Sequence, residues 1–97
     1  MTKAELIEKE IQKSVELFER VVRLNQKAIE NESMVVYSFD FSCGCNGVSF
    51  HVMARSADGE YTQLNDAKDH YLGQTYGKPL EEIEKEIEKE EKLYDTL

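Results

Sequence analysis

The chain has 97 residues and a net charge of −8, and its lysine and arginine side chains form no cluster. Proteins bind phosphate backbones through such clusters, so this composition argues against a nucleic-acid ligand. No apolar run approaches the roughly 18–20 residues that cross a bilayer, which argues against a membrane protein, and the length predicts a single domain over residues 1–97.

The N-terminal sequence and the cysteine content predict the cellular compartment. No apolar run follows a basic start, so we expect no signal peptide. The chain holds only two cysteines, which is typical of a protein without disulfide bonds. Together these features predict a reducing, cytoplasmic setting.

Residues 3–30 are predicted to form one long helix. Thr2 and Glu5 have the spacing of a capping box, and apolar side chains then recur at helical spacing in two adjacent rows. Such a helix is about 42 Å long, so we expect it to extend past a domain whose radius of gyration is only ~12–13 Å. The first row contains Ala4, Ile7, Ile11, Val15, Phe18, Val22 and Ile29, and the second contains Leu6, Leu17, Val21, Leu24 and Ala28.

The next segment, residues 35–57, has the alternating pattern of a β-hairpin. Asn46-Gly47 predicts a two-residue turn, because both residue types tolerate positive φ. We expect the first helix to pack on the sheet face that carries Tyr37, Phe39, Phe41, Val48, Phe50 and Val52. The predicted register pairs Cys45 with Val48, Cys43 with Phe50, Phe41 with Val52, and Phe39 with Ala54.

Three further elements are predicted after the hairpin. Asp58-Gly59 marks a tight turn before a short polar edge strand at residues 60–64. Asn65 has the character of an N-cap for a short helix over residues 66–72, and Pro79 begins a charged helix over residues 79–94. The predicted fold is therefore α+β in the order α-β-β-β-α, with the helices packed on one sheet face.

The last predicted helix is strongly acidic, since residues 80–97 carry eight acidic and three basic side chains. One interpretation is a row of carboxylates that imitates phosphates and blocks a basic protein. The alternative is a solvated face with i,i+4 pairs such as Glu81–Lys85 and Glu88–Lys92. The row would consist of Glu81, Glu84, Glu88 and Glu91.

Cys43-Gly44-Cys45 is the most specific local motif. The motif allows three interpretations. The two thiols form a redox pair, they supply half of a metal site, or they are small buried side chains without a chemical role. A zinc site requires about four ligands, and the chain offers only His51 and His70 as further cysteine or histidine ligands. We therefore expect no metal and no cofactor, with Cys43 and Cys45 as weak metal candidates.

Two polar groups have the residue types of catalytic or metal sites. His51 would lie opposite Ser42 with Asp40 on the same sheet face, but an open face lacks the sheltered oxyanion donors that a nucleophilic serine requires. Asp66 and His70 would share one face of the predicted short helix, where carboxylates more often complement the helix dipole. Neither group predicts an enzyme.

The predicted function follows from the apolar helix surface that exceeds what one sheet can cover. We expect the second row, with Leu17, Val21, Leu24 and Ala28, to meet either the last helix or a second copy of the chain, and we favour a homodimer. Tyr61, Tyr71 and Tyr76 are further candidate contact residues, because tyrosine is enriched at interfaces. The sequence thus predicts a small acidic, non-enzymatic interaction or accessory protein, with a dithiol protein and an acidic nucleic-acid mimic as alternatives.

Overall fold

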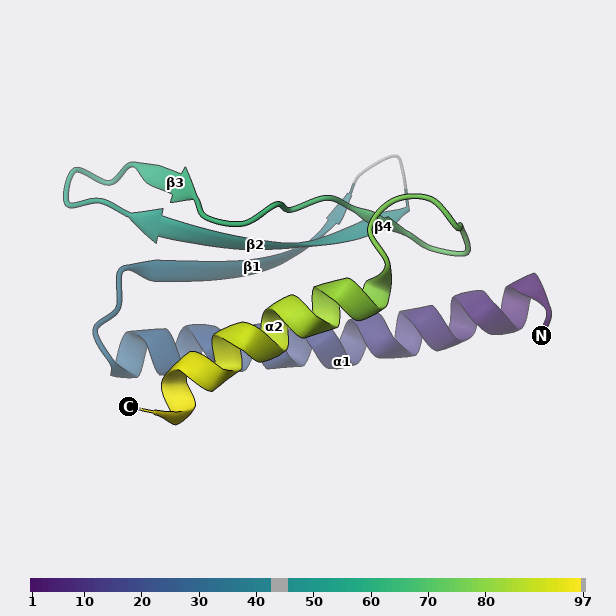
Figure 1. Cartoon of the computed structure of the whole chain (residues 1–97), viewed down its shortest axis with the longest axis horizontal. Helices are drawn as coiled ribbons and strands as arrows, with labels where there is room; N and C mark the ends of the chain where they lie inside the picture. The colour runs from purple at the N-terminus through teal and green to yellow at the C-terminus, as the bar shows by residue number, and fades with distance from the viewer. Residues whose placement is uncertain (43–45, 97) are drawn as a thin grey trace.

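The computed structural model describes residues 1–42 and 46–96. Two helices form one layer and an antiparallel sheet of four strands forms the other (Figure 1). This arrangement confirms the predicted α+β class. The elements are α1 (Lys3–Glu30), β1 (Val35–Ser42), β2 (Gly47–Arg55), β3 (Tyr61–Gln63), β4 (His70–Tyr71) and α2 (Leu80–Asp95).

The ends of α1 are defined by local hydrogen bonds. Thr2 and Glu5 form the predicted capping box. At the other end, Glu32 adopts a φ of 55°, the Ser33 amide donates to the Ala28 carbonyl, and the Glu32 amide donates to the Ile29 carbonyl. These are the two bonds of a Schellman motif, which ends the helix and reverses the chain into β1.

The predicted hairpin is present, but its predicted register is wrong. Phe41 pairs with Val48 and Phe39 pairs with Phe50, so each partner lies four positions earlier than expected. An even shift keeps the same side chains on the same face, so the aromatic residues still point toward the helices. The expected pairings of Cys43 and Cys45 fall outside the described residues.

Gly47 explains why the turn is not at Asn46-Gly47. It belongs to β2, where it pairs with Ser42 on one side and with Tyr71 on the other. A Cβ at this position would lie 3.1 Å from the His70 carbonyl oxygen. The glycine therefore permits the close approach of β4 rather than a tight turn.

The predicted helix over residues 66–72 is wrong, because this segment returns along the sheet as β4. The Asn65 side chain accepts from the Val52 amide and donates to the Phe50 carbonyl, so it pairs with β2 instead of capping a helix. Tertiary hydrogen bonds to the sheet therefore replaced the local bonds of a short helix. His70 consequently lies in a strand, and its predicted i,i+4 relation to Asp66 does not occur.

The remaining predicted elements are confirmed with small changes in their bounds. Gly59 has a φ of 91° in the turn before β3, which is the short edge strand beside β2. Pro79 is the cap residue of α2 rather than its first helical residue. No helix in the described part of the chain is long and apolar enough to span a membrane.

The core lies between the two layers. Leu17, Val21, Leu24 and Ala28 pack there against the sheet and α2, which is the first of the two alternatives predicted for the second apolar row. The expectation that Phe39 and Phe41 would be covered by α1 is wrong in part, because Phe39 is half-buried and Phe41 is 64% exposed. The cluster comprises Leu17, Val21, Leu24, Ala28, Tyr37, Phe50, Val52, Ile83 and Ile87.

Candidate functional site

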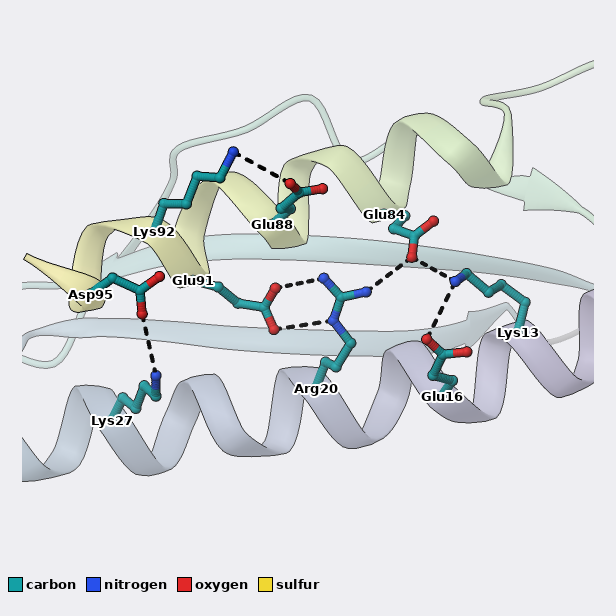
Figure 2. Close-up of polar contacts among 9 residues, drawn as sticks. All are labelled: Lys13, Glu16, Arg20, Lys27, Glu84, Glu88, Glu91, Lys92 and Asp95. Atoms are coloured by element: carbon teal, nitrogen blue, oxygen red, sulfur yellow. Dashed lines mark hydrogen bonds and ion pairs between the residues drawn. The ribbon is translucent and has the colours of Figure 1, made fainter.

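A network of ion pairs joins the two helices (Figure 2). Arg20 on α1 makes a bidentate contact with Glu91, at 3.1 Å through Nε and 2.5 Å through Nη2, and it reaches Glu84 at 3.0 Å. Lys13 lies 2.5 Å from the same Glu84 carboxylate and 3.3 Å from Glu16. The hydrogen bonds that Arg20 donates to Glu91 raise the pKa of Arg20 further above its ordinary value. This network orients α2 along α1.

The network divides the four glutamates that were predicted to form one row. Glu84 and Glu91 turn toward α1, where basic side chains neutralise them. Glu81 and Glu88 are exposed, and Glu88 pairs with Lys92. The exposed outer face of α2 also carries Lys85 and Lys89. Positive and negative charges therefore alternate along this face, and it does not present a continuous row of carboxylates.

Acid pH should weaken this network through Glu84. The hydrogen bond from Lys13 holds the pKa of Glu84 below its ordinary value of 4.5, so its stabilising effect is present above that value and is lost as the pH falls through the folded-state pKa. We expect Glu84→Gln to cost up to about 1 kcal/mol of unfolding free energy at neutral pH and almost nothing near pH ~2–3. Urea unfolding at both pH values measures this difference.

The matched control for that prediction is Glu88→Gln, because Glu88 lies on the same helix and its ion pair among the described residues is the surface pair with Lys92. Its effect should be smaller at neutral pH. Equal losses for the two variants at neutral pH would contradict the special role of Glu84.

A second polar contact connects α2 to the sheet. The Tyr37 hydroxyl lies 3.2 Å from a Glu90 carboxylate oxygen and 3.1 Å from the Tyr94 hydroxyl. Burial is the main reason that the pKa of Tyr37 is raised above its ordinary value, and the hydrogen bond with Tyr94 adds to it. This cluster is structural, since Tyr37 is buried and stacks on Phe50 at a centroid distance of 6.1 Å.

A buried pair, Glu10 and His70, fastens the segment before α2 to α1. His70 Nδ1 lies 3.0 Å from the Lys78 carbonyl, which only accepts, so Nδ1 donates there. His70 Nε2 contacts one carboxylate oxygen of Glu10, and the other oxygen accepts from the Gly73 amide at 2.7 Å. All of these polar atoms have partners within the chain, so the pair holds the fold together.

The three tyrosines predicted as contact residues are scattered. Tyr61 lies on the edge strand β3 and is exposed. Tyr71 and Tyr76 pack against each other at a centroid distance of 5.2 Å, and Tyr76 lines a hollow of about 530 Å³ beside α1. The structure therefore does not bring the three side chains together into one surface.

The polar face of the hairpin gathers a different group from the one predicted. His51 pairs with Ser38 rather than Ser42. Its Nε2 lies 3.0 Å from Ser49 Oγ and 3.4 Å from Asp40 Oδ2, and its Nδ1 contacts Gln63. A serine and an aspartate on the same ring nitrogen do not form a relay, because a relay requires the carboxylate on the other nitrogen.

The cysteine alternatives stay predictions, because Cys43 and Cys45 lie outside the described residues. Within residues 1–42 and 46–96, no three histidine, cysteine, aspartate or glutamate side chains are grouped so that they would hold a metal ion. Metal analysis of protein purified without chelator, together with thiol titration before and after unfolding, tests them.

An apolar surface lies on the side of α1 that faces away from α2. We define the α1–β1 apolar surface as Ile11, Val15, Phe18, Val22, Phe39 and Phe41. Apart from half-buried Phe39, these side chains are exposed in the chain. They come from the first apolar row of α1 and from the adjacent end of β1.

A groove between α1 and β1 makes this surface continuous. Its volume is about 340 Å³, and almost all of its lining side chains are apolar. The groove brings Phe39 and Phe41 next to residues of α1 that are more than 20 positions away in sequence. Its lining consists of Ile11, Ser14, Val15, Phe18, Phe39, Phe41, Val48 and Leu72.

Among residues 1–42 and 46–96, no strand pairs with the edge of β1 beside this groove. The Arg55 amide donates to the Met34 carbonyl, and hydrogen-bonded pairs alternate along an antiparallel ladder. The amides and carbonyls of Tyr37, Phe39 and Phe41 therefore point away from β2. Asn25 covers this edge at Tyr37 by accepting from its amide at 2.9 Å and donating to its carbonyl at 2.7 Å.

Sequence reasoning found the residues of this surface but assigned them wrongly. The sequence predicts both apolar rows of α1 but favours the row with Leu17 and Leu24 as the contact surface, and the structure buries that row in the core. The signal that would have distinguished the rows is Arg20 with Lys13, which mark the side of α1 that faces the acidic α2. A scan against protein-family models found no match, and neither the curated proteins nor the solved structures contained a significant match.

Proposed function

We propose that this chain is a small, non-enzymatic protein–protein interaction protein that binds through the α1–β1 apolar surface. One observation carries the proposal, namely that exposed apolar side chains from two elements form a continuous surface along a groove. Contiguous apolar patches of several hundred Å² on small soluble proteins mark interaction sites.

The exposed area supports this reading. Phe18 and Phe41 are 53% and 64% exposed. With about 150–250 Å² for each aromatic side chain, these two residues alone leave roughly 180–290 Å² of apolar surface in solvent. Adding Ile11, Val15 and Val22 brings the patch to the order of 500 Å², which is the size of the largest apolar patch on a typical monomer, and such patches are often functional.

The rim of the patch has the polar composition of an interface. Glu8, Glu19 and Gln26 lie on α1 next to the apolar row and are exposed. A polar rim around a dry apolar centre excludes water and gives a contact its specificity.

The proposal includes an accessory role in a reducing, cytoplasmic setting, in line with the cysteine content.

Site-specific photo-crosslinking in a native lysate tests the proposal. A photoreactive phenylalanine analogue in place of Val15 or Val22 should give protein adducts after irradiation. The matched controls replace Lys85 or Lys89, which lie exposed on the outer face of α2, and should give none. Adducts that form only from the α2 positions would contradict the proposal and favour a partner bound through the acidic helix.

A further inference from the structure

We infer that the α1–β1 apolar surface binds a second copy of this chain across a two-fold axis, with the two α1 helices antiparallel. The inference rests on the proposed function, because it assigns an occupant to the same surface. Three independent features of the chain support it: the spacing of the apolar row, the open edge beside the midpoint of that row, and the distribution of charge.

The exposed residues of the first apolar row, which exclude half-buried Ile7, have a palindromic spacing on α1. Ala4, Ile11, Val15, Phe18, Val22 and Ile29 read the same in either direction, because their separations are 7, 4, 3, 4 and 7 residues. At 100° per residue all six lie on one side of the helix.

A two-fold axis makes this row complementary to itself. In an antiparallel pair of helices, a two-fold axis brings each residue beside the residue at the same distance on the other side of the axis. A closed dimer requires a patch that is complementary to itself in this way. With the axis midway between Val15 and Phe18, Val15 lies beside Phe18 of the second copy, and Ile11 lies beside its Val22. Each apolar side chain of the row thus meets another apolar side chain, as in the packing of antiparallel helices.

The sheet ends on the same side of the molecule. β1 is the outer strand of the sheet, and its amides and carbonyls at Phe39 and Phe41 face away from β2. The groove places Phe41 next to Val15 and Phe18, which are the residues at the midpoint of the palindrome. The axis therefore passes near Phe41, and a second copy covers both the open edge and the most exposed aromatic side chain of the patch.

The charge distribution favours this face over the rest of the molecule. The chain carries a net charge of −8, so two copies repel each other in most orientations. Helix α1 is an exception, since it contains six basic and six acidic residues. α2, with most of the excess negative charge, packs on the Lys13 and Arg20 side of α1, opposite the patch. Association through α1 keeps the two acidic helices far apart.

The area is adequate for a dimer. A stable protein interface buries about 800 Å² on each partner, of which the apolar centre is the larger part. The patch provides on the order of 500 Å² of apolar surface, and its polar rim and the β1 edge provide the remainder.

Light scattering after size exclusion tests the oligomeric state. The wild-type chain should elute with twice its mass of 11.2 kDa at concentrations of tens of micromolar. Val15→Asp and Phe18→Asp should elute as folded monomers, with an unchanged circular dichroism spectrum, because an aspartate would be buried without a partner. Leu93→Asp, at an equally exposed leucine on α2, should remain a dimer.

Spin-label distances test the antiparallel arrangement in a background that carries Cys43→Ser and Cys45→Ser. For labels at Gln12→Cys and Gln26→Cys, the separations along the helix axis should be about 14 Å and about 28 Å, at 1.5 Å per residue on either side of the axis. A parallel dimer would give two equal short distances and would overturn the arrangement.

The outcomes separate this inference from the proposed function. A monomeric wild-type chain whose residue 15 crosslinks to a protein of another mass would overturn the dimer and leave the interaction surface standing. A monomeric chain without adducts at residues 15 or 22 would overturn both. If Leu93→Asp dissociates the dimer and Val15→Asp leaves it intact, the contact lies on α2 and the inference is overturned.

Discussion

Replacing Leu17 with alanine should lower the free energy of unfolding by about 3–5 kcal/mol. Leu17 is fully buried between the sheet and α2, where Ile83 and Ile87 also have no exposed surface. Removing its side chain loses the transfer free energy of the buried carbons and leaves a cavity that the helix cannot close. Small domains have only about 5–15 kcal/mol of stability, so the variant should unfold at a much lower urea concentration.

Leu93→Ala is the matched control for this prediction. It makes the same chemical change in a helix, but Leu93 is 55% exposed on α2. Its effect should be within about 0.5 kcal/mol. Both variants and the wild type are compared at one protein concentration, because association raises the apparent stability of a folded chain. Similar losses for the two leucines would show that the helices do not pack on the sheet through Leu17.

Replacing Glu10 with alanine should cost about 3–5 kcal/mol, the second large effect. Its carboxylate is 12% exposed, and it holds both the His70 ring and the Gly73 amide against α1. The alanine variant removes the acceptor that both of these largely buried groups contact. Thermal or urea unfolding followed by circular dichroism measures the loss.

Glu10→Gln separates the hydrogen bonds of this site from its charge. Glutamine has the same length and shape, and its amide oxygen still accepts from the Gly73 amide, so part of the lost stability should return. A double-mutant cycle with His70→Ala measures the coupling between the two side chains directly. A coupling near zero, or equal losses in Glu10→Ala and Glu10→Gln, would show that the pair does not hold the segment to α1.

The two helices of this fold have different electrostatic roles. α1 is neutral overall and offers Arg20 and Lys13 to the carboxylates of α2. Part of the negative charge of the C-terminal segment is therefore neutralised within the chain, because Glu84 and Glu91 form ion pairs with α1 and orient α2. The exposed apolar row with Val15 and Phe18 lies on the opposite side of α1, where α2 does not cover it.

Local interactions were sufficient to predict the two long helices, the hairpin and the turn at Gly59. The capping box of Thr2 and Glu5 involves residues three positions apart, and the periodicity of the apolar residues reports directly which element each segment forms. The faces of the hairpin were also predictable, because alternation along each strand survives an even change of register.

Contacts between distant segments decided the rest. The register of the hairpin and the position of Gly47 depend on β4, which lies more than 20 residues further along the chain. Residues 66–72 have the composition of a short capped helix, but hydrogen bonds from Asn65 and His70 to the sheet replaced it.

The sequence by itself determined an acidic α+β protein with two amphipathic rows on its first helix. Only the tertiary structure decided which row is buried, because that choice depends on where α2 packs. α2 packs Ile83 and Ile87 into the same core as Leu17 and Leu24, and Arg20 and Lys13 pair with its carboxylates on that side of α1. Val15 and Phe18 lie on the other side of α1 and stay in solvent, because one small sheet and one short helix cannot cover the whole circumference of a 28-residue helix.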